Sequence, residues 1–248
     1  MKISAQIGMP PVVSREVWLA ARKALLAQEK EVTRLRDAVN AARRRLPMVK
    51  IEKPYTFVGP DGTLDLLGLF AGRRQLYVHH FMWFEDRQAF CKGCTGAAHH
   101  TFNNPRLRDV LAGREVTFVA VSRAPFDKVA AYKAEHGWTF PWYSSHGTDF
   151  NYDFHTTLDE AKAPLEYNYR NKAELLASGF DADSLKEDWP ANSVFFRDGT
   201  DVYHTYSAYA RGLDSLHAPD AFLDLTPYGR QEEWEDSPAG WPKQPTFA

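Results

Sequence analysis

The chain has 248 residues, of which 44% are apolar and 25% are charged, and its formal net charge at pH 7 is −2. This composition is ordinary for a soluble globular protein, and a chain of this length buries a core that needs no disulfide framework. A net charge near zero argues against a nucleic-acid partner, because neutralising phosphates needs a basic surface. There is no apolar run of roughly 18 residues or more, so we expect no membrane-spanning segment.

The N-terminal residues 1–18 lack the long apolar stretch and the small-residue cleavage site of a secretory signal. We therefore expect a cytoplasmic protein. In that compartment structural disulfides are rare, and a pair of cysteines is more often catalytic or metal-binding.

Residues 14–46 predict one long, highly charged helix, with Ser14 as its N-cap and Pro47 as its stop. Apolar residues recur at steps of three and four and form a narrow seam, close to a heptad repeat: Trp18, Ala21, Leu25, Val32, Leu35, Val39, Ala42 and Leu46. The seam either packs on its own domain or forms a homodimer through residues 18–46, and both interpretations stay open. No aromatic interleaving accompanies the basic face, which disfavours a nucleic-acid role.

The pattern changes at Tyr55. Residues 55–67 predict a short β-hairpin with Gly, Pro and Asp at its tip. Gln75–Met82 predicts a strand, and the loop Trp83–Phe90 connects it to the cysteines. A helix is expected to begin at the cysteine pair and to run towards Leu111.

A second, largely apolar strand is expected at Glu115–Ser122, of the kind buried on both faces. Pro125–His136 predicts a helix that has proline in its first turn and ends before Gly137. Trp142–Ser144 predicts a short strand. The polar stretch 146–189 shows no pattern that predicts defined elements.

Two further strands, Ser193–Arg197 and Val202–Tyr206, flank the turn signal Asp198-Gly199 and predict a hairpin. A last helix is expected within Asp214–Leu225, and the proline-rich residues from 232 onward are expected to be irregular.

This order of elements is a mixed α/β layout, in which the first two long strands should be parallel with a right-handed crossover. A CxxC pair near that crossover is typical of a thioredoxin-like redox domain. We therefore expect a thioredoxin-like α/β fold, in a peroxiredoxin-like variant, with a mixed central sheet flanked by helices. The expected parts are the long helix within residues 1–50, the thioredoxin-like domain at 51–231 and an irregular tail at 232–248.

Cys91 and Cys94 are the only cysteines, and together they form a CxxC dithiol. Thiol–disulfide exchange by a dithiol needs one thiol that ionises near neutral pH and a second thiol within reach of the first. A helix N-terminus stabilises a thiolate, so Cys91 is expected to be the nucleophile and Cys94 the buried resolving partner. Lys92 should lower the pKa of Cys91 further, whereas Glu85 and Asp86, if they fold nearby, would raise it.

The cysteine pair has three alternative uses, which are metal binding, peroxide reduction and binding without turnover. Cys91, Cys94, His99 and His100 could hold zinc or copper, although a structural zinc site usually draws ligands from two separated knuckles. Peroxide-reducing relatives of this fold place proline and Thr or Ser at set positions before the reactive cysteine, and here Phe84 and Gln88 occupy them. A binding module without turnover is the remaining alternative.

Several stretches carry a family resemblance, among them VSREVWLAARKALLAQEKEVTRLRD, YTFVGPDGTLDLLGLFAGRRQLYVHHFM, GWTFPWYSSHGTDFNYDF and SVFFRDGTDVYHTYSAYARGLD. The chain resembles a bacterial family of thioredoxin-like proteins of unknown function, described as predicted dithiol–disulfide oxidoreductases, over about residues 12–231. The resemblance implies the thioredoxin-like fold, the long helix as a family feature, and Cys91 and Cys94 at the family's cysteine positions. Many members carry proline after the first cysteine, where this chain has Lys92-Gly93.

In thioredoxins a cis-proline packs over the active disulfide just before the antiparallel hairpin. The corresponding place here is near Asn192 and Ser193, with Pro190 shortly before them. If Pro190 is not cis, Asn192 or Ser193 takes that role. These two residues, with Trp83 and Lys92, are expected to line the site. We expect no cofactor, a protein or small-molecule thiol or disulfide as partner, and neither nucleic acid nor membrane.

Overall fold

The computed structural model describes residues 8–245, and the chain divides into two compact units. One unit combines the N-terminal segment through Pro47 with the residues from Asp220 onward, and the other spans Met48–Pro219 and contains both cysteines. No helix among the described residues is both long enough and apolar enough to cross a bilayer.

The smaller unit contains α1, Arg15–Arg43, which confirms the predicted long helix. The Ser14 side chain caps it by accepting a hydrogen bond from the backbone N–H of Val17 at 3.4 Å. None of its residues is buried, and apolar side chains of the seam such as Val32 are 61% exposed. Homodimerisation through the seam stays a prediction.

The C-terminal segment, expected to be irregular, has no helix or strand after α7, Ala218–Leu223, in its described part. It is nevertheless tied down within the smaller unit. The backbone N–H of Gly8 donates to the carbonyl of Gly240 at 3.0 Å, and the Tyr228 hydroxyl donates to the Gly8 carbonyl at 3.0 Å.

The larger unit is built on an eight-stranded sheet with the strand order β1-β12-β11-β4-β7-β8-β2-β3. Strands β4, β7 and β8 are parallel, and every other neighbouring pair is antiparallel. The strands are β1 Val49–Lys50, β2 Thr56–Gly59, β3 Gly62–Asp65, β4 Gln75–His80, β7 Val116–Ser122, β8 Trp142–Ser144, β11 Ala191–Asp198 and β12 Asp201–Tyr209.

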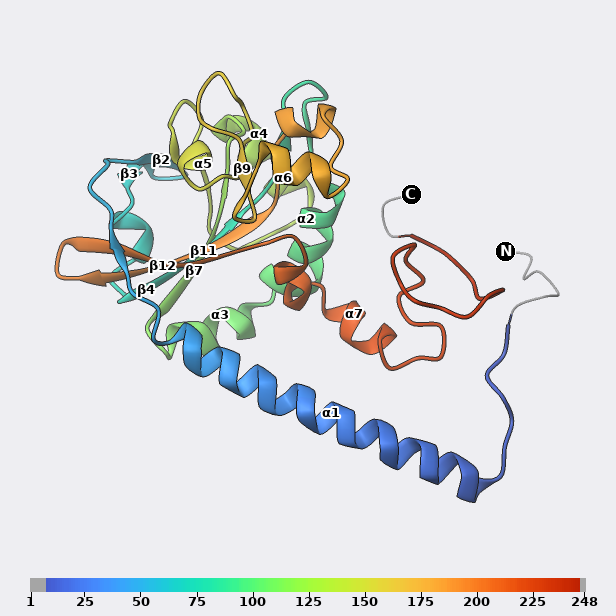
Figure 1. Ribbon diagram of the computed structural model, residues 1–248. Helices are drawn as coiled ribbons and strands as arrows, with labels where there is room; N and C mark the ends of the chain where they lie inside the picture. Colours follow the sequence, from blue (N-terminus) through green and yellow to red (C-terminus); the bar gives the residue numbers. More distant parts are fainter. Residues whose placement is uncertain (1–7, 246–248) are drawn as a thin grey trace. The chain divides into compact units, whose positions relative to one another are not determined.

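The four central strands β7-β4-β11-β12 join a parallel crossover to an antiparallel hairpin, which is the thioredoxin-like arrangement (Figure 1). The predicted fold class and the predicted strands at 75–82, 115–122 and 142–144 are confirmed. The hairpin of β11 and β12 is longer than predicted, and it turns at Gly199, whose φ of 58° suits glycine.

Helices follow the parallel strands, as the layout predicts. The crossover from β4 to β7 contains α2, a π-helical turn and α3, and α4 lies between β7 and β8. The α-helices of this unit are α2 Lys92–Ala97, α3 Pro105–Ala112, α4 Phe126–Glu135, α5 Phe150–Asp153 and α6 Lys172–Ala177, and the π-helical turn is Ala98–Phe102. Short 3-10 turns are η1 Gly68–Phe70, η3 Asp183–Lys186 and η4 Ala210–Leu216.

The helix expected to continue from the cysteines to Leu111 is in fact broken, so that prediction is wrong in its second half. The π-helical turn ends at Phe102, and a new helix begins at Pro105. Proline has no N–H to donate to the preceding turn and favours the first turn of a helix. The Asn104 side chain caps this new start by accepting a hydrogen bond from the Arg106 N–H at 3.0 Å.

Side chains alternate between the two faces of β4. Tyr77, His79 and Phe81 face a core that also contains Cys94 and Phe102. Leu76, Val78 and His80 face the opposite core, where His80 stacks on Phe150 of α5 at 5.4 Å. The sheet is therefore covered on both faces, as the apolar strands predict.

The stretch 146–189, for which no elements were expected, forms its own small layer. It contains α5, the two-stranded pair β9 Glu166–Tyr167 and β10 Arg170–Asn171, α6 and η3. A third core holds it against the end of the main sheet, with these buried residues: Leu158, Leu165, Tyr167, Leu175, Leu185, Ala191 and Tyr209.

Two adjacent buried histidines, His79 and His80, predict acid sensitivity. Burial lowers the pKa of His79 to about 4 and that of His80 to about 3, so both are neutral at pH 7. The His79 Nδ1 atom lies 2.9 Å from Asn192 Oδ1, which leaves its Nε2 atom without a hydrogen-bond partner among the described residues.

We expect the free energy of unfolding to fall as the pH drops from 6.5 towards 5. In the unfolded chain the two histidines bind protons at the ordinary histidine pKa of about 6.5, whereas in the folded chain they stay neutral to much lower pH. Their contribution to stability is therefore fully present above pH 6.5 and is lost progressively below it. Each histidine should contribute a slope of up to about 1.4 kcal/mol per pH unit. Denaturant titrations at several pH values measure this slope. A His80→Gln variant should lose about half of it, and an unchanged slope in that variant would contradict the assignment.

Candidate functional site

The two cysteines lie at the start of the first crossover helix, beyond the carboxyl end of β4. Between β4 and the cysteines the chain forms a small hairpin of β5, Trp83–Phe84, and β6, Ala89–Phe90. Cys91 is the N-cap residue of α2, and its N–H donates to the Met82 carbonyl at 3.3 Å. Cys91 is partly exposed, and Cys94, one turn further on, is buried at 4% exposure. The expected placement of the dithiol at a helix start is confirmed.

The environment of Cys91 favours its thiolate. A hydrogen bond from the Cys94 thiol is the main influence that lowers the pKa of Cys91 to about 6, and partial burial opposes it. The backbone N–H groups of Cys94 and Gly93, at the first turn of α2, lower the pKa further, as does the positive charge of Arg87.

Cys94 has the opposite environment. Burial raises the pKa of the Cys94 thiol well above its ordinary value, and its hydrogen bond to Cys91 and the negative charge of Asp188 act in the same direction. At neutral pH the pair therefore consists of an accessible thiolate and a buried protonated thiol.

Arg87, rather than Lys92, is the cation that acts on Cys91. Lys92 is exposed, although it is the neighbour of Cys91 in sequence. The Arg87 guanidinium lies over the Phe84 ring at 3.9 Å and pairs with Glu187 at 2.8 Å. The predicted unfavourable acids are occupied elsewhere, because Asp86 pairs with Arg87 at 3.5 Å and Glu85 with Arg123 at 2.9 Å.

Arg87→Ala and Lys92→Ala form a matched pair of charge removals. We expect the rate of Cys91 alkylation by iodoacetamide to rise with pH around a midpoint near 6 in the wild type, the pKa of Cys91. Arg87→Ala should raise the midpoint by a few tenths of a unit, and Lys92→Ala should leave it nearly unchanged. Cys94→Ala, which removes the largest influence, should raise it most. The opposite ranking of the two cations would contradict the structure.

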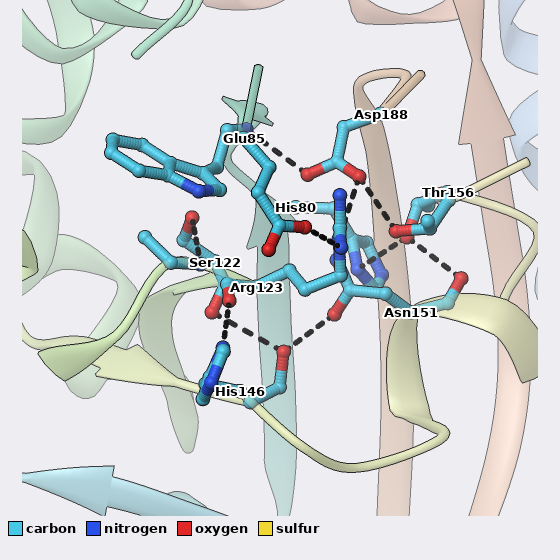
Figure 2. Close-up of polar contacts among 12 residues, drawn as sticks. His80, Glu85, Ser122, Arg123, His146, Asn151, Thr156 and Asp188 are labelled. Atoms are coloured by element: carbon cyan, nitrogen blue, oxygen red, sulfur yellow. Dashed lines mark hydrogen bonds and ion pairs between the residues drawn. The ribbon is translucent and has the colours of Figure 1, made fainter. Parts of the chain in front are cut away.

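A buried ion pair between Arg123 and Asp188 fixes the elements around it (Figure 2), and the charge of Asp188 acts on Cys94. Asp188 is 1% exposed and accepts hydrogen bonds from the Trp83 N–H at 3.0 Å, the Thr157 hydroxyl at 2.7 Å and the Arg123 Nε–H at 3.1 Å. Burial raises the pKa of Asp188, and the charge of Arg123 opposes that rise. Arg123 also donates to Glu85 at 2.9 Å. The pair therefore links β5, the end of β7 and the 146–189 layer.

Trp83, predicted to line the site, lies between two concave surfaces. One is a cavity of about 820 Å³ that is lined by Trp83, Arg123 and Asp188 and otherwise by the 146–189 layer and the loop 84–86. The other is a groove of about 340 Å³ between the β5–β6 hairpin and α4. The Trp83 ring also packs on Phe90 at 4.8 Å, directly before Cys91.

Asn192 and Ser193 are buried in β11, and each side chain bonds a histidine, while Ser193 Oγ also lies 2.9 Å from Ser207 Oγ. Asn192 bonds His79, and Ser193 Oγ lies 2.9 Å from His80 Nε2. There is no cis peptide bond in the described residues, so the bond before Pro190 is trans. The negative charge of Asp188 acts on the buried Cys94 thiol, and the Tyr167 hydroxyl donates to the Pro190 carbonyl at 3.0 Å.

The alternative metal site does not form. Within residues 8–245, no three His, Cys, Asp or Glu side chains come close enough together to hold an ion. His99 and His100 lie in the π-helical turn and are exposed, and His99 Nδ1 accepts a hydrogen bond from Trp138 Nε1 at 3.4 Å.

Arg87, Arg123 and Asp188 were not predicted from the sequence. Arg123 carried a usable signal, because it follows a buried parallel strand, and functional side chains gather at the carboxyl ends of such strands. Asp188 carried none, since it ends a polar stretch without periodicity. Arg87 lies in the loop before the cysteines, where it follows two acidic residues and no pattern marks it as functional.

Fold and site together define a thioredoxin-like protein that carries a dithiol at the start of its first crossover helix. The sequence profile of a family described as bacterial protein of unknown function (DUF899) matches residues 7–245. The chain therefore belongs to the DUF899 family. The sequence matches no curated protein.

Similar solved structures include peroxidoxin BcpB from Mycobacterium tuberculosis, with 16% identity, a TM-score of 0.39, and 70% of this chain and 93% of that chain covered. Bacterioferritin comigratory protein from Xanthomonas campestris has 13% identity and a TM-score of 0.41, with 68% of this chain and 97% of that chain covered. A peroxiredoxin-like protein from Aquifex aeolicus has 11% identity and a TM-score of 0.38, with 66% and 81% covered. At such scores the likeness adds nothing about chemistry.

Proposed function

We propose that this protein is a thiol–disulfide oxidoreductase in which Cys91 attacks and Cys94 resolves. The observation that carries the proposal is the placement of the pair, with a partly exposed Cys91 at the start of α2 and a buried Cys94 one turn further on. Cys91 has a pKa lowered to about 6 at a helix start, while the pKa of its buried partner is raised. A thiolate is the nucleophile of disulfide exchange, and a second thiol one turn away can release the product.

In the first step the Cys91 thiolate attacks one sulfur of a substrate disulfide. A Cys91–substrate bond forms, the substrate S–S bond breaks, and the leaving thiolate takes a proton from water. Cys94 then loses its proton and attacks the Cys91 sulfur, which releases the second substrate thiol. The protein ends as the Cys91–Cys94 disulfide, and the substrate has gained two electrons and two protons.

A second cycle needs an external thiol reductant, which returns the protein disulfide to the dithiol. The reverse direction, in which the disulfide form oxidises a substrate dithiol, uses the same steps. Peroxide reduction is less well supported, because Phe84 and Gln88 supply no hydroxyl before Cys91, and the Gln88 side chain donates to the Glu85 carbonyl at 2.8 Å.

Reduction of insulin disulfides by dithiothreitol, with catalytic amounts of protein, tests the proposal. We expect turnover above the uncatalysed rate in the wild type and none in a Cys91→Ser variant. A wild-type rate equal to the background, with hydroxyethyl disulfide as well as with insulin, would instead favour a binding module without turnover.

A further inference from the structure

We propose that the groove between the β5–β6 hairpin and α4 binds an extended peptide segment next to the substrate's disulfide, so that the preferred substrates are protein disulfides. This inference rests on the proposed oxidoreductase function and adds its substrate class. The groove, here called the hairpin groove, has a volume of about 340 Å³ and is lined by Trp83, Gln88, Ala89, Phe90, Lys128, Ala131, Tyr132 and Glu135.

The hairpin groove adjoins residues that flank the reactive Cys91. Phe90 forms one wall and immediately precedes Cys91 in the chain. Tyr132 lines the groove from α4 and packs against Phe90 at a ring distance of 4.6 Å. The Tyr132 hydroxyl lies 3.0 Å from the Thr95 hydroxyl, which in turn donates to the Cys91 carbonyl at 2.9 Å. A chain lying in the groove therefore leads directly to the helix start that holds the thiolate.

The length of the hairpin groove suits a peptide. Lys128 and Glu135 are seven positions apart on α4, so its helical wall is about 10 Å long. An extended peptide advances about 3.3 Å per residue, so roughly three residues fit along it. Such a segment can place one apolar side chain against the aromatic walls while its disulfide reaches Cys91.

The chemistry of the lining favours a peptide segment over a small charged thiol. Three aromatic rings and two alanines form most of the wall. The exposed Lys128 and Glu135 lie two turns apart and make no ion pair with any described residue. One cation and one anion match a segment with little net charge. A glutathione-like ligand carries two carboxylates and one ammonium, so one of its carboxylates would lie against apolar or acidic surface.

Ala131 and Ala130 provide a matched test, because both are exposed on α4 and only Ala131 lines the groove. We expect Ala131→Trp to fill the groove and to lower kcat/KM for insulin by about tenfold or more, the usual loss at a central contact. The same variant should keep its rate with hydroxyethyl disulfide within about twofold. Ala130→Trp should change neither rate, and Ala131→Gln should give an intermediate loss with insulin.

The outcomes separate the two proposals. If the wild type reduces neither substrate, the oxidoreductase function itself fails. If the wild type reduces both and folded Ala131→Trp affects both equally, or neither, the peptide site is overturned while the function stands. Thermal unfolding establishes whether Ala131→Trp is folded. If it is not, Ala131→Gln decides: a loss confined to insulin supports the site, and equal effects on both substrates overturn it.

Discussion

A Cys94→Ser variant should accumulate a covalent complex in which Cys91 is joined to the substrate by a disulfide. Cys91 stays accessible in this variant, while the thiol that resolves the mixed disulfide is absent. A Cys94→Ala variant also lacks the hydrogen-bond donor that most lowers the pKa of Cys91, so its first attack should be slower at pH 6 than in the wild type. At pH 8 that difference should shrink, because more Cys91 ionises.

Non-reducing electrophoresis and intact mass after incubation with a disulfide-containing protein measure this trapping. Turnover should fall by on the order of a thousandfold in Cys94→Ser, because each molecule completes only its first half-reaction. Cys91→Ser serves as the control, since its remaining thiol is buried and protonated, and it should trap nothing. Equal trapping by both variants, or trapping through Cys94 alone, would reverse the assigned roles.

The second large effect is expected at Asp188. Asp188→Ala leaves the Arg123 Nε–H, the Thr157 hydroxyl and the Trp83 N–H without the acceptor they share. Removing one partner of a buried ion pair typically costs about 3–5 kcal/mol, because the other charge is left uncompensated. We therefore expect the free energy of unfolding to fall by about this amount in a denaturant titration. The β5–β6 hairpin should also loosen, and hydrogen exchange at the Trp83 N–H should become faster.

The double variant Arg123→Met/Asp188→Leu tests whether the uncompensated charge causes the loss. Replacing both members of a buried pair with apolar residues is often close to neutral, so this variant should recover much of the stability lost in Asp188→Ala. The side chain of Arg123 is 19% exposed and keeps Glu85 as a partner, so the cost in Asp188→Ala should lie towards the lower end of the range. A double variant less stable than Asp188→Ala would show that the pair stabilises the fold by itself.

The elements that position the dithiol could be predicted from the sequence because local signals and burial agree there. The apolar run of β7 and the Asp198-Gly199 turn each favour the structure that is observed. The break after the π-helical turn was not predicted, although Asn104-Pro105 signals a helix start.

The surroundings of the thiols were less predictable, because they depend on contacts between distant parts of the chain. Lys92 is adjacent to Cys91 in sequence, yet a helical N-terminus turns its side chain to solvent and leaves Arg87 as the effective cation. The charge of Asp188 acts on Cys94 because the 146–189 layer packs against the end of the sheet. Neither relation appears in the spacing of residues along the chain.

A redox titration of the purified protein tests the central claim most directly. The protein is equilibrated in glutathione buffers of graded potential, quenched with an alkylating agent and analysed by intact mass. We predict one two-electron transition between the dithiol and the Cys91–Cys94 disulfide. Its midpoint should be less negative than the roughly −270 mV of thioredoxin, because the low pKa of Cys91 stabilises the reduced form. A protein that keeps two alkylatable thiols across the whole series, or that forms only glutathione adducts, would contradict a cycling dithiol.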